Sequence, residues 1–185
     1  MSGADAMRRR AVRLAVSSLG LLGAASAAVA QPDSETERVK CEAVASVWAP
    51  VRMPEAGINA AIPCNDEQLA AYKNSNEARK AASGLAGCER DGRTFSVLYL
   101  INTPAGFFDN AVTNWKRSPV QNFEVGGHRV FRAAAVGKGE TYGQQLIEID
   151  PARAVLMWTS SKVPKDADFS TMTSCFFNSF RVVKS

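Results

Sequence analysis

Histidine is almost absent from this chain of 185 residues, since His128 is the only one. A Ser-His-Asp hydrolase would have to use this single imidazole as its base, and the sequence contains no Gly-x-Ser-x-Gly elbow. The glycines at 126–127 and at 137 and 139 match neither a phosphate-binding loop nor a dinucleotide fingerprint, and neither group opens a helix. We therefore expect no catalytic residue set and no cofactor.

Cysteine pairs at metal-binding spacing are also missing. The four cysteines, Cys41, Cys64, Cys88 and Cys175, are separated by 23, 24 and 87 residues, and none belongs to a Cys-x-x-Cys motif. A zinc site is therefore not expected. An even number of cysteines in an exported chain favours disulfides instead.

A long apolar run occurs only near the N-terminus, at residues 14–29. Four arginines precede it, and it ends in Ala28, Val29 and Ala30, the small-x-small pattern of a signal peptidase site. The run is short for a membrane span. We expect residues 1–30 to be a cleavable signal peptide for the general secretory route, although Arg9 and Arg10 leave the twin-arginine route open. The mature chain, with no membrane span, is then periplasmic or secreted.

Net positive charge is small once this segment is removed. The whole chain carries +4, but residues 1–30 hold four of the 22 basic residues and only one of the 18 acidic residues, so the remainder carries +1. A basic field that would attract nucleic acid or anionic lipid is therefore not expected. Arg129, Arg132 and Lys138 could form a local basic patch, and we expect them on a solvated face.

The remaining sequence is long enough for one domain. Residues 31–40 are predicted to be a flexible lead and residues 41–185 a single α+β domain. Alternating or continuous apolar segments predict strands near residues 58–62, 85–89, 94–101, 123–125, 128–135, 142–148 and 153–159, and residues 42–48 fit a strand or a short helix. Asp91 and Gly92, Gly126 and Gly127, and the glycines at 137 and 139 mark tight turns.

Two amphipathic helices complete the pattern. Thr103 and Pro104 are predicted to open the first, which Ser118 and Pro119 end. Asp166 or Asp168 caps the second, whose apolar stripe consists of Phe169, Met172, Phe176 and Phe180. Asn65 is predicted to cap a shorter helix that ends near residue 72. The order β-β-β-α-β-β-β-α predicts a mostly antiparallel sheet of about six strands with two main helices packed on it.

This order and two local features resemble one known group. A strand ends in Ile62 and Pro63, and the last helix reads Phe176, Phe177, Asn178, Ser179, Phe180. Together they resemble the Mog1/PsbP/DcrB group of α/β/α sandwich domains, many of them exported bacterial proteins. The resemblance implies accessory or binding work, and no functional residue is carried over from it.

The strand order favours one of the three possible cysteine pairings. Cys64 follows the strand at residues 58–62 and Cys88 lies in the next predicted strand. If these strands are neighbours, their Cα atoms can approach to the distance that a disulfide requires. Cys64–Cys88 and Cys41–Cys175 are therefore the favoured pairs.

These observations favour a non-enzymatic, exported accessory or binding domain with a protein or small-ligand partner in the cell envelope. His128 and Arg129 are the candidate functional residues, since they follow the turn at Gly126 and Gly127. Two alternatives stay open. One is a small secreted hydrolase that uses His128, and the other is an inhibitor or immunity-type protein that acts on a partner.

Overall fold

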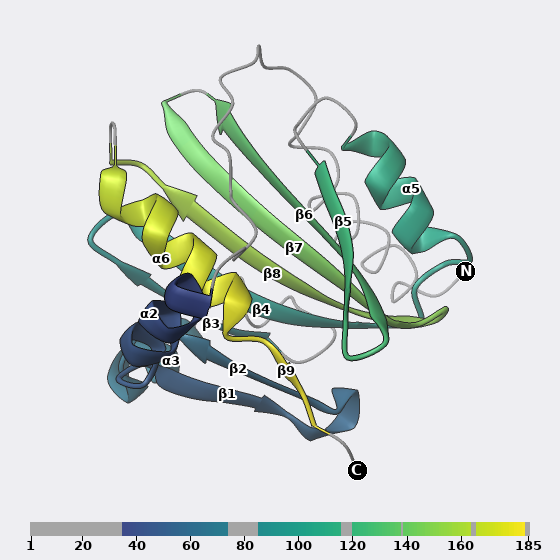
Figure 1. The fold of residues 1–185 in the computed structure, drawn as a ribbon, viewed down its shortest axis with the longest axis horizontal. Coiled ribbons are helices and arrows are strands. Elements are labelled where there is room, and N and C mark those ends of the chain that lie inside the picture. The colour runs from purple at the N-terminus through teal and green to yellow at the C-terminus, as the bar shows by residue number, and fades with distance from the viewer. Residues whose placement is uncertain (1–34, 74–84, 116–119, 138, 164–165, 184–185) are drawn as a thin grey trace.

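The structure is a computed structural model that describes residues 35–73, 85–115, 120–137, 139–163 and 166–183. This part of the chain forms an α+β fold with two antiparallel sheets (Figure 1). Its four α-helices are α2 (Glu35–Ala45), α3 (Asp66–Lys73), α5 (Phe107–Asn114) and α6 (Ala167–Asn178), and one 3-10 turn, η1, spans Pro54–Ala56.

The larger sheet has six strands in the order β3-β4-β8-β7-β6-β5, and every neighbouring pair is antiparallel. Asp91 and Gly92 join β3 to β4 with positive φ angles of 52° and 71°, as a tight hairpin turn requires. Gly126 and Gly127 join β5 to β6 in the same way. The strands are β3 (Leu85–Arg90), β4 (Arg93–Ile101), β5 (Val120–Val125), β6 (His128–Gly137), β7 (Glu140–Asp150) and β8 (Arg153–Ser161).

The smaller sheet has three strands in the order β1-β2-β9: β1 (Ala49–Met53), β2 (Ile58–Ile62) and β9 (Arg181–Val182). It joins the N-terminal hairpin to the C-terminal end of the described chain, because β9 pairs with Ile58 and Asn59. The turn through η1 ends at Gly57, whose φ of 64° is left-handed.

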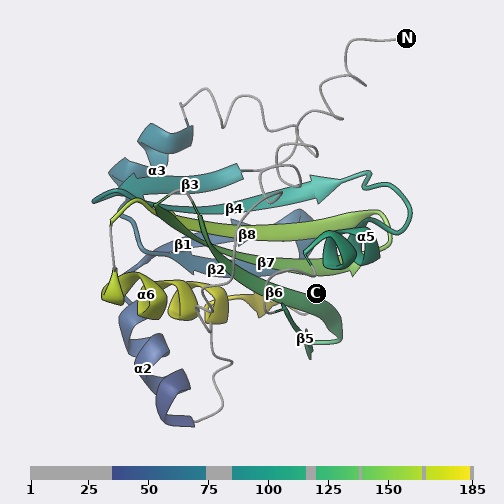
Figure 2. The ribbon, with the colours of Figure 1, turned by 90° about the horizontal axis from the view of Figure 1, so that it is seen from above.

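The two faces of the six-stranded sheet carry separate cores. On one face, which we call the α6 face, α6 and the smaller sheet cover the inward side chains of β4, β6, β7 and β8, and Phe95 packs edge-to-face on Phe176 at 5.6 Å. On the opposite α5 face, Trp115 and Phe108 pack on Phe131 with ring centroids 4.1 and 5.6 Å away. Figure 2 shows α2 beside α6, and α3 beside β3 at the edge of the six-stranded sheet.

The six-stranded antiparallel sheet confirms the predicted α+β class, but the predicted order of elements is only roughly matched. The sequence predicts one strand or short helix before residue 50 and two main helices, whereas the structure has helix α2, strand β1 and the short strand β9, with four α-helices in the described residues. Residues 35–40, predicted to be part of a flexible lead, lie in α2.

Capping interactions explain which of the predicted helix N-termini are present in the structure. Asn65 and Gln68 exchange hydrogen bonds of 2.8 and 3.0 Å at the start of α3, the reciprocal pattern of a capping box. Asp166, one of the two predicted caps of α6, accepts a hydrogen bond of 3.0 Å from the Phe169 amide. Thr103 does not cap α5, because the helix begins after Gly106. The Thr103 hydroxyl lies 3.4 Å from the Pro151 carbonyl oxygen, and its amide donates to the Ala152 carbonyl in the β7–β8 turn.

Candidate functional site

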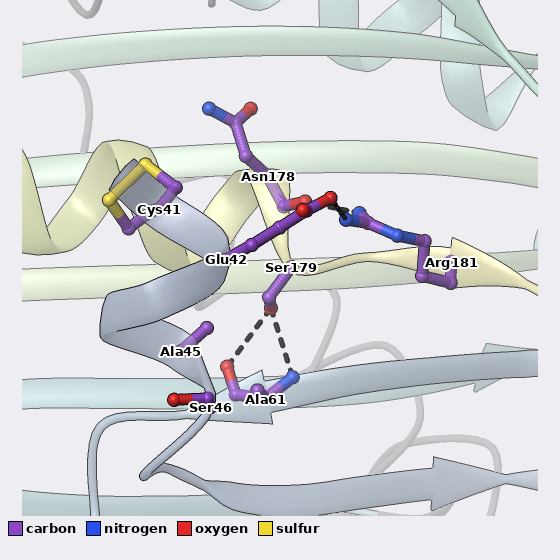
Figure 3. A pocket seen from close by; sticks show the side chains of 9 residues that line it. Cys41, Glu42, Ala45, Ser46, Ala61, Asn178, Ser179 and Arg181 are labelled. Atoms are coloured by element: carbon purple, nitrogen blue, oxygen red, sulfur yellow. Dashed lines mark hydrogen bonds and ion pairs between the residues drawn. A yellow bond between two sulfur atoms is a disulfide. The ribbon is translucent and has the colours of Figure 1, made fainter. Parts of the chain in front are cut away.

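A pocket of about 220 Å³ opens between α2, β2 and the C-terminal end of α6 (Figure 3). We call it the α2–α6 pocket. The disulfide Cys41–Cys175 forms one wall and joins the two helices, with its Cα atoms 4.8 Å apart. The lining combines small apolar side chains with a polar rim, and consists of Cys41, Glu42, Ala45, Ser46, Ala61, Cys175, Asn178, Ser179 and Arg181.

Ser179 fixes the end of α6 to the edge of this pocket. Its hydroxyl accepts a hydrogen bond of 2.9 Å from the Ala61 amide and lies 3.0 Å from the Ala61 carbonyl oxygen (Figure 3). The same hydroxyl lies 2.7 Å from the Phe176 carbonyl oxygen in the last turn of the helix. Since the disulfide and this serine tie both helices to each other and to β2, the pocket is held in one shape.

Arg181 is the basic group of the rim. Its guanidinium donates to the carbonyl oxygens of Asn178 and Phe180, where a cation complements the negative end of a helix. It also forms an ion pair of 3.3 Å with Glu42, in which both side chains are about half exposed. Such an exposed pair contributes at most about 1 kcal/mol, so a ligand can compete for either partner at small cost.

Arg132 lies on β6, on the α6 face, with only 2% of its surface exposed. This position corrects the prediction of a solvated patch, since Arg129 lies on the opposite face of the same strand, and Lys138 is outside the described residues. Strand β6 is covered on both faces, and its residues 130, 132 and 134 alternate toward α6. Burial lowers the pKa of the Arg132 guanidinium to about 10, so the group is still charged at neutral pH.

Among the described residues, the side chains in contact with this charge are neutral. Gln145 Oε1 accepts from Nε and Nη2 at 2.9 and 2.6 Å, and Asn178 Oδ1 accepts from Nη2 at 2.9 Å. The rings of Phe123 and Phe177 lie 5.2 and 5.3 Å from the guanidinium carbon, within the range of cation–π attraction. Asn178 connects this cluster to the α2–α6 pocket, since its side chain also lines the pocket.

A second pocket, of about 310 Å³, lies between β1 with η1 and the β3–β4 pair. The Tyr99 hydroxyl donates to the Glu55 carbonyl at 3.4 Å, and Arg153 Nη1 reaches the same oxygen at 3.3 Å. Most of the lining is apolar, and consists of Val51, Arg52, Met53, Glu55, Leu85, Ala86, Tyr99 and Ile101.

The structure places His128 and Arg129, the predicted functional residues, at the start of β6 and away from both pockets. His128 Nδ1 lies 3.2 Å from the Glu148 carbonyl oxygen. Arg129 forms ion pairs with Asp109 on α5 and Glu148 on β7 at 2.5 and 3.0 Å, and it lies 4.4 Å over the Phe108 ring. These contacts hold α5 on the sheet, and they bring no hydroxyl, thiol or carboxylate nucleophile of the described chain to His128.

The disulfides are the two favoured pairs, although β2 and β3 are not neighbouring strands and belong to different sheets. Cys64 and Cys88 are joined with Cα atoms 6.3 Å apart, and Cys41 is joined to Cys175. Within the described residues no group of three or more histidine, cysteine, aspartate or glutamate side chains could hold a metal ion. No helix in that part of the chain is long and apolar enough to span a membrane.

Asn178 and Ser179 were not singled out from the sequence, and Arg132 was expected only in a solvated basic patch. Asn178 and Ser179 stand out only as part of the terminal aromatic segment, and their roles depend on β2 and β6, which are distant in sequence. Arg132 lies inside a strand with apolar neighbours, but the sequence pattern does not tell whether its face of the strand is covered. No model of a known protein family matches the chain, and no curated protein matches it.

Proposed function

We propose that the chain is an exported, non-enzymatic binding domain that receives a small ligand, or one side chain of a partner, in the α2–α6 pocket. The observation that carries the proposal is the fixed shape of this pocket. The disulfide Cys41–Cys175 and the Ser179 contacts to Ala61 hold its walls before any ligand arrives. Preorganisation of this kind reduces the entropy lost on binding.

The size and chemistry of the pocket limit the ligand. A volume of about 220 Å³ is below the range of drug-sized sites, which runs from roughly 300 to 1,000 Å³. The occupant is therefore a small solute or a single side chain. Ser46, Asn178 and the Arg181–Glu42 pair supply donors and acceptors of both charges around an apolar floor, which suits a zwitterionic or amide-bearing group.

The same proposal includes export from the cytoplasm and a fold of the kind found in the Mog1/PsbP/DcrB group. Two disulfides support an oxidising compartment such as the periplasm or the cell exterior. The helices α5 and α6 on opposite faces of the antiparallel sheet support an α/β/α arrangement of the Mog1/PsbP/DcrB kind. The partner is then a small molecule or protein of the cell envelope.

The proposal is tested by titrating the disulfide-bonded protein with free amino acids, dipeptides and primary amides, and by measuring the melting temperature. A binding solute raises the melting temperature in a saturable way. Ala61→Leu places a larger side chain in the pocket and is expected to abolish the increase. Ala152→Leu makes the same change at an exposed turn, so it should leave the increase intact.

Two outcomes would contradict the proposal. One is a solute that stabilises the wild type and the Ala61→Leu variant equally, because it then binds elsewhere. The other is the absence of any saturable stabilisation across the three solute classes. A third measurement addresses catalysis: ester and peptide hydrolysis that disappears in a His128→Gln variant would favour the hydrolase alternative over a binding domain.

A further inference from the structure

The second pocket, between β1 with η1 and the β3–β4 pair, lies at an open sheet edge. Strand β1 is the outermost strand of the smaller sheet, and among the described strands it pairs with β2 alone (Figure 1). Val51, Arg52 and Met53 all line the pocket, although the side chains of a strand alternate between its two faces. Val51 and Met53 are buried and Arg52 is exposed, so the pocket extends from the inner face of β1 around to its open edge.

The strand register shows which backbone groups of β1 lie at this edge. In an antiparallel ladder, successive residues direct their N–H and C=O groups alternately toward the partner strand and away from it. The Ala61 amide and carbonyl are both hydrogen-bonded to the Ser179 hydroxyl, so they point away from β1, and the backbone groups of the paired Pro50 point away from β2. Alternation then directs the N–H and C=O of Arg52 outward as well. No hydrogen bond in the described part of the chain uses these two groups.

The wall opposite β1 comes from the larger sheet and is mostly apolar. Leu85 and Ala86 on β3 line it together with Tyr99 and Ile101 on β4. Ile101 is 43% exposed although its side chain is large and apolar. The pocket measures about 310 Å³, and benzene fits a cavity of roughly 150 Å³, so two apolar side chains of that size can enter.

The rim of the pocket carries two charged side chains, Arg52 and Glu55, that form no ion pair within the described residues. Glu55 lies past the end of β1, on η1, so Arg52 is the charge that stands beside an added strand. Opposite charges in directly opposed positions stabilise a strand pair, and like charges destabilise it. A second copy of β1 that paired antiparallel about Arg52 would set two guanidiniums against each other. The charge therefore favours an acidic partner over a symmetric dimer.

We propose that an extended partner peptide with the pattern apolar–acidic–apolar adds to the open edge of β1. Its acidic residue pairs with Arg52, exchanges both backbone hydrogen bonds with it and places a carboxylate beside the guanidinium. The two flanking apolar side chains then lie on the inner face, beside Val51 and Met53, and occupy the pocket. In this mode of recognition main-chain hydrogen bonds supply affinity and alternate side chains supply specificity. Pro50 and Pro54 have no N–H, so they confine the pairing to the segment between them.

This inference goes beyond the function proposed for the α2–α6 pocket. Among the described residues, none lines both pockets. The Ala61→Leu variant should therefore bind the peptide as the wild type does, and the peptide should not displace a solute held between α2 and α6. Failure of either proposal leaves the other standing.

The test follows the fluorescence anisotropy of labelled peptides titrated with the disulfide-bonded protein. The probe is the peptide Gly-Ser-Ile-Glu-Phe-Ser-Gly, which should bind saturably. Lysine in place of the central glutamate should raise the Kd roughly tenfold, because an attractive cross-strand pair becomes a repulsive one. Methylation of the glutamate nitrogen removes one backbone hydrogen bond and hinders close approach of the strands, so it should raise the Kd at least about tenfold although every side chain is unchanged.

Two variants of the protein locate the site. Arg52→Glu should reverse the preference, so that the lysine peptide binds more tightly than the glutamate peptide, and loss of folding cannot produce such a reversal. Ile101→Ser removes an apolar contact from the pocket and should weaken the glutamate peptide severalfold. Val183→Ser is the matched control, since Val183 is 45% exposed and lies outside the pocket, and it should leave the Kd unchanged.

Three results would overturn the proposal. They are the absence of saturable binding by the glutamate peptide, equal binding of its N-methylated form, and an unchanged charge preference in Arg52→Glu. Sedimentation velocity checks the competing occupant. A dimer of the wild type that dissociates in Ile101→Ser would show that a second copy of the chain covers this edge instead of a peptide.

Discussion

Asp166 provides the sharpest test of the energetics, because its carboxylate is almost fully buried at the start of α6. Only 2% of the side chain is exposed. Arg93 Nε and Nη2 donate to its two oxygens at 2.6 Å each, the Ser161 hydroxyl donates at 2.7 Å, and the Phe169 amide donates at 3.0 Å. Four such bonds favour the charged form.

The hydrogen bonds from Arg93, with smaller contributions from Ser161 and Phe169, lower the pKa of Asp166 from 3.8 to about 2. One pKa unit corresponds to about 1.4 kcal/mol, so the interaction contributes about 2 kcal/mol to stability at neutral pH. The pKa is lower in the folded state, so the contribution is complete above the unfolded pKa near 4 and is lost as the pH falls through about 2.

We therefore expect Asp166→Asn to be less stable than the wild type by at least about 2 kcal/mol at pH 6, and this difference should shrink by about 1.5 kcal/mol by pH 2.5. Urea unfolding of both proteins across this range measures it. Asp168→Asn is the control, since Asp168 is exposed in the same first turn, and its helix-dipole contribution is at most about 1 kcal/mol. A difference between the wild type and Asp166→Asn that stays constant with pH would refute the reasoning.

The remaining predictions concern cross-links and close packing. Replacing both cysteines of Cys41–Cys175 by serine should lower the free energy of unfolding by about 5 kcal/mol, and the same change at Cys64–Cys88 by about 3.5 kcal/mol, because the loops span 134 and 24 residues. Unfolding in guanidinium should show the larger loss for Cys41–Cys175. Gly126→Ala should destabilise more than Gly127→Ala in the same assay, since both have positive φ but only the first Cβ would lie 2.9 Å from Val182. Gly143→Ala should lower stability by about 1–3 kcal/mol, because its Cβ would lie 2.7 Å from Thr159 Oγ1, and an unchanged melting temperature would contradict this close packing.

Local sequence patterns were sufficient to predict those elements that are stabilised by residues close to them in sequence. The hairpin at Asp91 and Gly92 and the cap of Asn65 on α3 are present as predicted. Phe169 and Phe176 lie buried on α6 as predicted, but the helix ends at Asn178, so Phe180 lies beyond it. Each of these depends on contacts within a few residues or on one periodic face.

Elements that depend on distant contacts could not be predicted in this way. Helix α2 has a charged sequence with a weak apolar face, and it is fixed by Cys41–Cys175 rather than by its own pattern. Strand β9 has two residues and exists through its pairing with Ile58 and Asn59. Thr103 is a residue type that often caps helices, but its hydroxyl and its amide both contact the β7–β8 turn, at Pro151 and Ala152.

The candidate site was missed for the same reason. Alternation along β6 places Arg132 on one face, but it does not tell whether that face is covered. The burial of Arg132 follows from two features of the tertiary structure. The strand order places Gln121 and Gln145 on either side of it, and α6 supplies Asn178 and Phe177. His128 and Arg129 were chosen because they follow the turn at Gly126 and Gly127; they line neither described pocket, and their functional role stays a prediction.

The pairing of β2 with β9 determines the order in which parts of the chain can fold during synthesis. The hairpin β1–β2 and helix α2 are synthesised before β9, Ser179 and Cys175, with which they make their contacts. Helix α2 and the β1–β2 hairpin can therefore reach their final state only after residue 182 has been made. A product that terminates before residue 175 would leave Cys41 unpaired and the outer edge of β2 open, and so would present a free thiol and an exposed strand to the proteases and chaperones that remove incomplete chains.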